Sequence, residues 1–152
     1  DNDEALAVFV EALEIRRRES DKEFSLRDDE VRKIQLSKIL NNIGCVYFEC
    51  QSNRKALKSF ENALEIQRSI SEKKSDAGLH TPVDLPMAST LSNISYVHMA
   101  SERWSDAIEY LETADELQQS ILDPSNPIVT NTLENLAYCS AMEGYRDMAL
   151  AV

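Results

Sequence analysis

Large apolar residues recur every three to four positions along most of the chain, the spacing that places them on one face of an α-helix. The clearest stretch reads Leu40-x-x-Ile43-Gly44-x-x-Tyr47, followed by Ala56-x-x-x-Phe60-x-x-Ala63. Each half has the period of an amphipathic helix, and a short polar segment separates them. The pattern therefore predicts two antiparallel helices that pack against each other.

The same order of large and small residues returns along the sequence. Four alanines take equivalent places, at spacings of 51, 51 and 42 residues: Ala5, Ala56, Ala107 and Ala149. A helix–turn–helix repeat needs about 34 residues, so each unit has room for an insertion. These regular spacings predict an all-α fold of stacked helix pairs.

Small side chains mark the points where the two helices of each pair are expected to cross. On the first helix these are Gly44, Ser95 and Ala137, and on the second they are Ala56, Ala107 and Ala149. Phe60 and Leu111 are expected to fill the space beside them. A bulky residue at a crossing would be overpacked, at a cost of about 1–3 kcal/mol.

The scarcity of helix breakers, 3 Gly and 4 Pro, allows long helices. We expect helices over 3–22, 28–51, 53–74, 86–101, 103–122 and 127–143, and a further one from Tyr145. They form one helical-repeat domain over 1–152, with a partial repeat 1–24, repeats 25–74 and 83–122, and a partial repeat 126–152. The segment is thus expected to begin and end mid-repeat.

Charge is unevenly distributed along the chain. The net charge is −11, of which residues 1–74 carry −1 and residues 75–152 carry −10. An acidic surface repels phosphate backbones and anionic lipids, so neither nucleic acid nor a membrane is an expected partner. No apolar run reaches the roughly 18 residues that a membrane span requires. The charge favours solubility, or a preference for neutral or basic partners.

No residues with the spacing of a catalytic, metal or cofactor site stand out. The three cysteines form no CxxC pair, which indicates reduced thiols and a cytoplasmic protein. Phosphate loops and serine nucleophile motifs are missing from the sequence. His98 takes the place of Tyr47 in the second copy and is expected to pack. We therefore expect no enzyme, no cofactor and no small-molecule substrate.

The quoted motifs resemble the tetratricopeptide repeat. The longer spacing resembles its kinesin-light-chain-like branch, whose repeats run to about 42 residues, the distance from Ala107 to Ala149. The segment from Asn126 to Leu136, Asn-Pro-Ile-Val-Thr-Asn-Thr-Leu-Glu-Asn-Leu, looks like the start of a first helix in that branch. This resemblance implies a right-handed α-α superhelix, a tetratricopeptide-like solenoid, with a concave groove lined by the first helices.

Asn42, Asn93 and Asn135 each precede the large residue before a crossing position, on the face that the resemblance assigns to the groove. A carboxamide both donates and accepts hydrogen bonds, so a row of them can hold an extended peptide backbone. The alternative is that these asparagines lie on a solvated helix face.

Further candidates share this face through helical spacing. They are Lys38, Asn41 and Cys45 on one first helix, Tyr96 on the next and Tyr138 on the last. The tyrosines could anchor a ligand or pack between neighbouring first helices. Lys38 is the one basic residue among them, whereas the resembled branch uses a basic groove for acidic cargo. That departure weakens the expectation of an acidic ligand.

The sequence predicts a scaffold that binds a peptide or protein segment in its groove. Two alternatives stay open: a structural spacer or self-assembling segment, and the regulatory arm of a larger enzyme.

Overall fold

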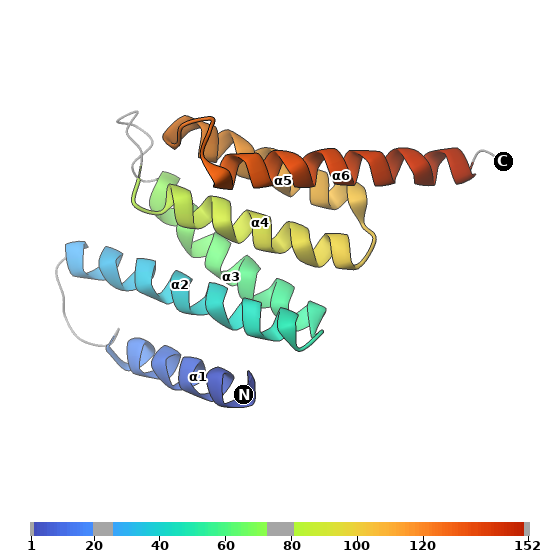
Figure 1. Ribbon diagram of the computed structural model, residues 1–152. Helices are drawn as coiled ribbons and strands as arrows, with labels where there is room; N and C mark the ends of the chain where they lie inside the picture. The colour runs from blue at the N-terminus through green and yellow to red at the C-terminus, as the bar shows by residue number, and fades with distance from the viewer. Residues whose placement is uncertain (1, 20–25, 73–80, 151–152) are drawn as a thin grey trace. The chain divides into compact units, whose positions relative to one another are not determined.

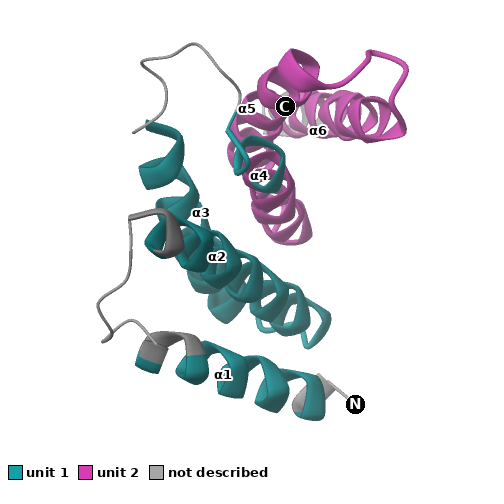
Figure 2. Cartoon of the chain, turned by 90° about the vertical axis from the view of Figure 1, so that its left-hand side faces the viewer, with its two compact units in different colours: residues 1–86 teal, residues 87–152 magenta. Residues whose placement is uncertain are grey.

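The computed structural model describes residues 2–19, 26–72 and 81–150. Within those ranges the chain forms six α-helices and no strand, which confirms the all-α prediction. The helices are α1 (Asn2–Glu19), α2 (Leu26–Glu49), α3 (Asn53–Glu72), α4 (Asp84–Ala100), α5 (Trp104–Ile121) and α6 (Pro127–Leu150) (Figure 1). The chain divides into two compact units, residues 1–86 and residues 87–152 (Figure 2).

In the first unit, α2 packs against both α1 and α3, and α2 and α3 run antiparallel (Figure 1). Their crossing lies at Gly44, as predicted. A Cβ atom on Gly44 would lie 2.4 Å from the ring of Phe60, so only glycine fits under this side chain. Phe60 is 1% exposed, and Ala56 and Ala63 beside it are fully buried. The predicted order of small and large residues therefore matches the packing of this helix pair.

The turns that end α2 and α4 have the same hydrogen-bond pattern. Gln51 and Glu102 have positive φ angles, 56° and 55°. After α2, the amide of Gln51 donates to Phe48 O and that of Ser52 to Tyr47 O, both at 2.8 Å. The corresponding pair of bonds follows α4. This is a Schellman motif, which satisfies the last carbonyls of a helix and reverses the chain direction.

In the second unit, α5 lies against α6, and a core of Trp104, Ala107, Leu111 and Cys139 joins them. Met99 near the end of α4 packs on the same core. His98, also on α4, is 8% exposed and stacks on Tyr110 of α5 with 5.3 Å between the ring centroids. The expectation that His98 is a packing residue is therefore confirmed.

Helix α4 begins two residues before the predicted start at Pro86. Asp84, its first residue, is 6% exposed and accepts hydrogen bonds from the Thr81 amide at 2.7 Å and from the Ser71 hydroxyl at 3.1 Å. The Thr81 hydroxyl donates to the same carboxylate. Proline is tolerated in the first turn, where its missing N–H has no helical partner to lose. Pro86 therefore does not delay the helix.

The predicted break before Tyr145 is wrong, because α6 continues without interruption from Pro127 to Leu150. Gly144 lies inside it, with nothing within 4 Å of the place of a Cβ atom. A single glycine costs a helix only about 1 kcal/mol and does not end it without a competing contact. Ala137, predicted to be a buried crossing residue, is instead exposed, since no described helix covers that face. The side chain of Ala149 lies outside the described residues.

Candidate functional site

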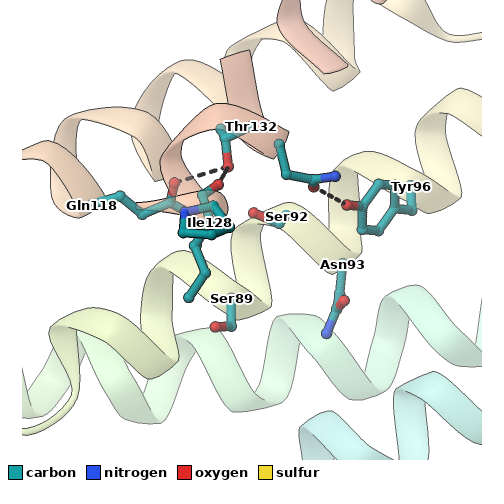
Figure 3. A pocket seen from close by; sticks show the side chains of 9 residues that line it. Ser89, Ser92, Asn93, Tyr96, Gln118, Ile128 and Thr132 are labelled. Carbon is teal, nitrogen blue, oxygen red and sulfur yellow. Dashed lines mark hydrogen bonds between the residues drawn. The ribbon is translucent and has the colours of Figure 1, made fainter. Parts of the chain in front are cut away.

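The second unit contains an open groove of about 340 Å³ (Figure 3). Its wall comes from the middle of α4, the end of α5 and the first turns of α6. The lining residues are Ser89, Ser92, Asn93, Tyr96, Gln118, Pro127, Ile128, Asn131 and Thr132. The volume lies in the range of ordinary ligand sites. All of these side chains are uncharged, and most have a hydroxyl or an amide group.

A phenol and two amides join α4 to α6 at the groove. The Tyr96 hydroxyl donates to Asn131 Oδ1 at 3.1 Å and accepts a hydrogen bond from Asn135 Nδ2 at 3.2 Å. Asn135 Nδ2 also donates to Asn131 Oδ1 at 3.2 Å. We call Tyr96, Asn131 and Asn135 the clasp. Asn131 and Asn135 are one helical turn apart on α6, which is why a single phenol can reach both.

The clasp leaves one donor and one acceptor unused. Asn135 Nδ2 donates two bonds, and Asn131 Oδ1 accepts two. Within the described part of the chain, no hydrogen bond uses Asn131 Nδ2 or Asn135 Oδ1. An N–H group and a carbonyl oxygen are what a peptide group of an extended chain requires.

A buried hydrogen bond positions the start of α6 beside the groove. The Thr132 hydroxyl donates to Gln118 Oε1 of α5 at 2.8 Å, and both side chains are nearly inaccessible, at 3% and 2% exposed. Asn126 caps α6 by accepting the Ile128 amide at 2.9 Å. Ile128 thereby lies on a fixed first turn, yet it stays 54% exposed. It offers an apolar surface to a ligand.

The loop before α6 is held by its own hydrogen bonds. Asp123 accepts the Ser125 hydroxyl at 2.6 Å and the Ser125 amide at 2.9 Å. These bonds to Ser125, first from the side chain and then from the backbone, lower the pKa of the Asp123 carboxyl. The ionised carboxylate of Asp123 therefore holds the turn that leads into Pro127.

The predicted residues of the second unit have different environments. Asn93 and Tyr96 line the groove, and Asn135 belongs to the clasp. Tyr96 lines the groove and bonds to Asn131 on the next first helix, and its suggested role as a ligand anchor stays a prediction. Tyr138 is 51% exposed and contacts Trp104 of α5 edge-on, with 5.8 Å between ring centroids. Its ring contact is thus with a second-type helix rather than with a neighbouring first helix.

The remaining predicted residues belong to α2 in the first unit and have accessible side chains. Lys38 and Asn42 are exposed, and Asn41 and Cys45 are partly buried. Desolvation and, secondarily, the charge of Glu49 raise the pKa of the Cys45 thiol.

Four groove residues lie outside the helix face predicted from sequence: Gln118, Pro127, Ile128 and Thr132. Ser89, Ser92 and Asn131 also line the groove and were not selected as site residues. One signal was available, because Gln118 lies 51 residues after Gln67, the spacing of the equivalent alanines. Both glutamines are buried. A polar residue repeated at a buried position of a helix is a sign of a specific hydrogen bond.

The described ranges contain neither a metal-binding cluster nor a membrane-spanning helix. Among these residues, no group of three or more His, Cys, Asp or Glu side chains could hold a metal ion. None of the described helices combines the length and the apolar character needed to cross a bilayer.

Comparison with known proteins gives a match over part of the chain. No curated protein is similar enough to the sequence to count as a match. The matched stretch runs from the middle of α2 to near the end of α3 and includes the Gly44–Phe60 crossing. Residues 37–70 match the tetratricopeptide repeat family, which supports the resemblance for this helix pair.

Proposed function

We propose that the chain is a protein-interaction scaffold and that the groove of its second unit binds an extended peptide segment. Tetratricopeptide repeats are protein–protein interaction modules, and residues 37–70 match this family. The observation that carries the proposal is the clasp, in which Tyr96 holds Asn131 and Asn135 at the edge of the groove.

The clasp favours a peptide ligand because it is built before the ligand arrives. Free asparagine side chains would lose rotamer entropy on binding, at about 0.5–1.5 kcal/mol for each immobilised side chain. Here the hydrogen bonds to Tyr96 already orient both amides. A bound backbone N–H and C=O could then bond to Asn135 Oδ1 and Asn131 Nδ2, each bond contributing about 1 kcal/mol. Asn93, three residues before Tyr96 on α4, also lines the groove.

Two finer features stay predictions. The resemblance to the kinesin-light-chain-like branch and a cytoplasmic location both rest on the sequence motifs described above. The α2 residues Lys38, Asn41, Asn42 and Cys45 are proposed as a second contact surface, since they occupy the corresponding face of the first unit.

The test is selection of ligands from a random dodecapeptide phage library on the immobilised chain, followed by affinity measurements on synthetic copies of the enriched peptides. The groove variant changes Asn93, Asn131 and Asn135 to Ala. The control variant changes three exposed α5 residues, Glu109, Thr113 and Gln119, to Ala. Circular dichroism and urea unfolding establish that both variants are folded.

We expect selected peptides to bind the control variant as they bind the native chain. The groove variant should bind them at least tenfold more weakly, because about two or more hydrogen bonds are lost. Equal binding by the two variants would contradict the proposal and would favour a spacer role. An enriched set that depends on Lys38 and Asn42 instead would move the site to α2.

A further inference from the structure

We infer that the groove of the second unit selects against acidic ligands and takes a segment with an uncharged centre and lysine or arginine on its flanks. This inference rests on the proposed function, and it specifies the chemistry of the ligand. It depends on three observations: the lining of the groove, the charge balance of the second unit, and the position of Glu134.

The groove offers no charge to a ligand. Its nine lining residues are serine, threonine, asparagine, glutamine, tyrosine, proline and isoleucine. A carboxylate or phosphate that entered would exchange its hydration for neutral hydrogen-bond donors. Burial of an ion without a counter-charge is costly. The ligand residues that occupy the groove are therefore uncharged, and the exposed side chain of Ile128 favours an apolar one among them.

Each of the two arginines of the second unit lies beside a carboxylate and outside the groove. Arg103 Nε lies 3.8 Å from Asp106 Oδ2, and Arg146 Nη1 lies 3.6 Å from Glu143 Oε2. Residues 87–152 contain ten Asp and Glu residues and only these two arginines, which gives the unit a net charge of −8. Neither arginine lines the groove. The potential around the unit is therefore negative, and it repels an acidic segment while attracting a basic one.

Glu134 brings one of these carboxylates next to the clasp. It is exposed on α6, three residues after Asn131 and directly before Asn135. Residues three apart on a helix are neighbours at about 5–6 Å between Cβ atoms. A lysine or arginine on the flank of a bound peptide can therefore approach Glu134, while an acidic residue there meets a like charge.

The experiment uses synthetic versions of one peptide enriched on the native chain. The versions share the central sequence and have two flanking Ala, two flanking Lys or two flanking Glu residues. Fluorescence anisotropy gives the dissociation constant of each at low and at high NaCl concentration. Two variants of the full chain test the location of the charge effect: Glu134→Lys and Glu109→Lys. They change the net charge equally, but Glu109 lies on the exposed face of α5.

We expect the Lys-flanked peptide to bind about two- to fivefold more tightly than the Ala-flanked one at low salt, and the Glu-flanked one to bind correspondingly more weakly. The differences should shrink at high salt because salt screens exposed charges. Glu134→Lys should remove or invert the preference, and Glu109→Lys should change it much less.

Three results separate the possible failures. Enriched peptides rich in Asp and Glu, or equal binding of all three versions, would overturn the inference and leave the groove intact as a peptide site. Equal effects of Glu134→Lys and Glu109→Lys would mean that the preference for Lys-flanked peptides comes from net charge alone, and would overturn the role of Glu134. A library that yields no peptide sensitive to the groove variant would overturn the proposed function itself.

Discussion

Gly44 on α2 and Ala137 on α6 occupy the same place in the sequence pattern and have opposite environments. Gly44 lies directly under the ring of Phe60, where even one added carbon would overlap it. Ala137 is exposed, although the residues around it follow the same order of large and small side chains. The difference lies in the partner, because α3 folds back across α2 while α6 continues as one helix.

The comparison teaches that a crossing residue depends on two helices. A small side chain permits close approach, but the approach occurs only where a second helix supplies the covering residue. On α6 the buried face is the opposite one, where Cys139 packs into the core with Trp104 and Leu111 of α5. Helix α6 thus has a buried face, which packs against α5, and an exposed face around Ala137, which we call the open face.

The largest expected effect separates the two crossing positions directly. Gly44→Leu should lower the free energy of unfolding by about 3 kcal/mol, the upper end of what overpacking a filled core typically costs. Ala137→Leu should change it by no more than about 0.5 kcal/mol, as expected for an exposed site. Urea unfolding followed by circular dichroism measures both.

A compensating pair makes this prediction more specific. Gly44→Ala should be partly rescued by Phe60→Leu, which shortens the side chain that the new methyl group meets. Additive losses in the double variant would show that the Phe60 contact is not what constrains Gly44.

The next effect compares the buried and open faces of α6. Thr132→Val removes the hydroxyl that bonds to Gln118 and should cost about 1–3 kcal/mol, because the buried amide oxygen loses its partner. Thr130→Val, at an exposed position two residues earlier, is the matched control and should change stability by about 0.5 kcal/mol or less. Comparable losses in the two variants would argue that the Gln118 bond contributes little.

A smaller effect, of opposite sign, tests a feature that the two units share. Gln51→Gly and Glu102→Gly should each stabilise the chain by about 0.5–1 kcal/mol, since a left-handed backbone is unfavourable for L-residues that have a side chain. Differential scanning calorimetry should show a higher melting temperature for both. A gain in only one variant would mean that the equivalence of the two turns does not extend to their energetics.

The smallest stability effect concerns the clasp. Tyr96→Phe removes two partly exposed hydrogen bonds and should cost about 0.5–1 kcal/mol, while Tyr138→Phe should cost almost nothing. The same Tyr96 variant should bind selected peptides more weakly, because the two amides lose their orientation. Unchanged binding would separate the clasp from ligand recognition.

Much of the fold could be predicted from the sequence, and particular residues show why. The spacing of Leu40, Ile43 and Tyr47 is local information, and it was sufficient to place α2 within two residues at each end. The Gly44–Phe60 contact could also be predicted, because a glycine set between large residues at helical spacing indicates close approach of a second helix. The continuation of α6 past Gly144 could not be predicted from the sequence, since it depends on the lack of a competing contact around this residue.

The candidate site could be predicted only in part. Asn93, Tyr96 and Asn135 were identified because they share a helix face, which follows from spacing alone. The clasp required the distance between α4 and α6, and the sequence does not encode that distance in any local pattern. For the same reason Asn131 was not selected, and Tyr138 was grouped with Tyr96 although its contact is with Trp104.

The most direct test of the central claim is an NMR titration of the ¹⁵N-labelled chain with a selected peptide, following backbone and asparagine side-chain amides. The account predicts the largest shift changes at Ser92, Asn93, Asn131 and Asn135, with saturation at one peptide per chain. Changes confined to the exposed face of α2 around Asn42, or to the open face of α6 around Ala137, would contradict it.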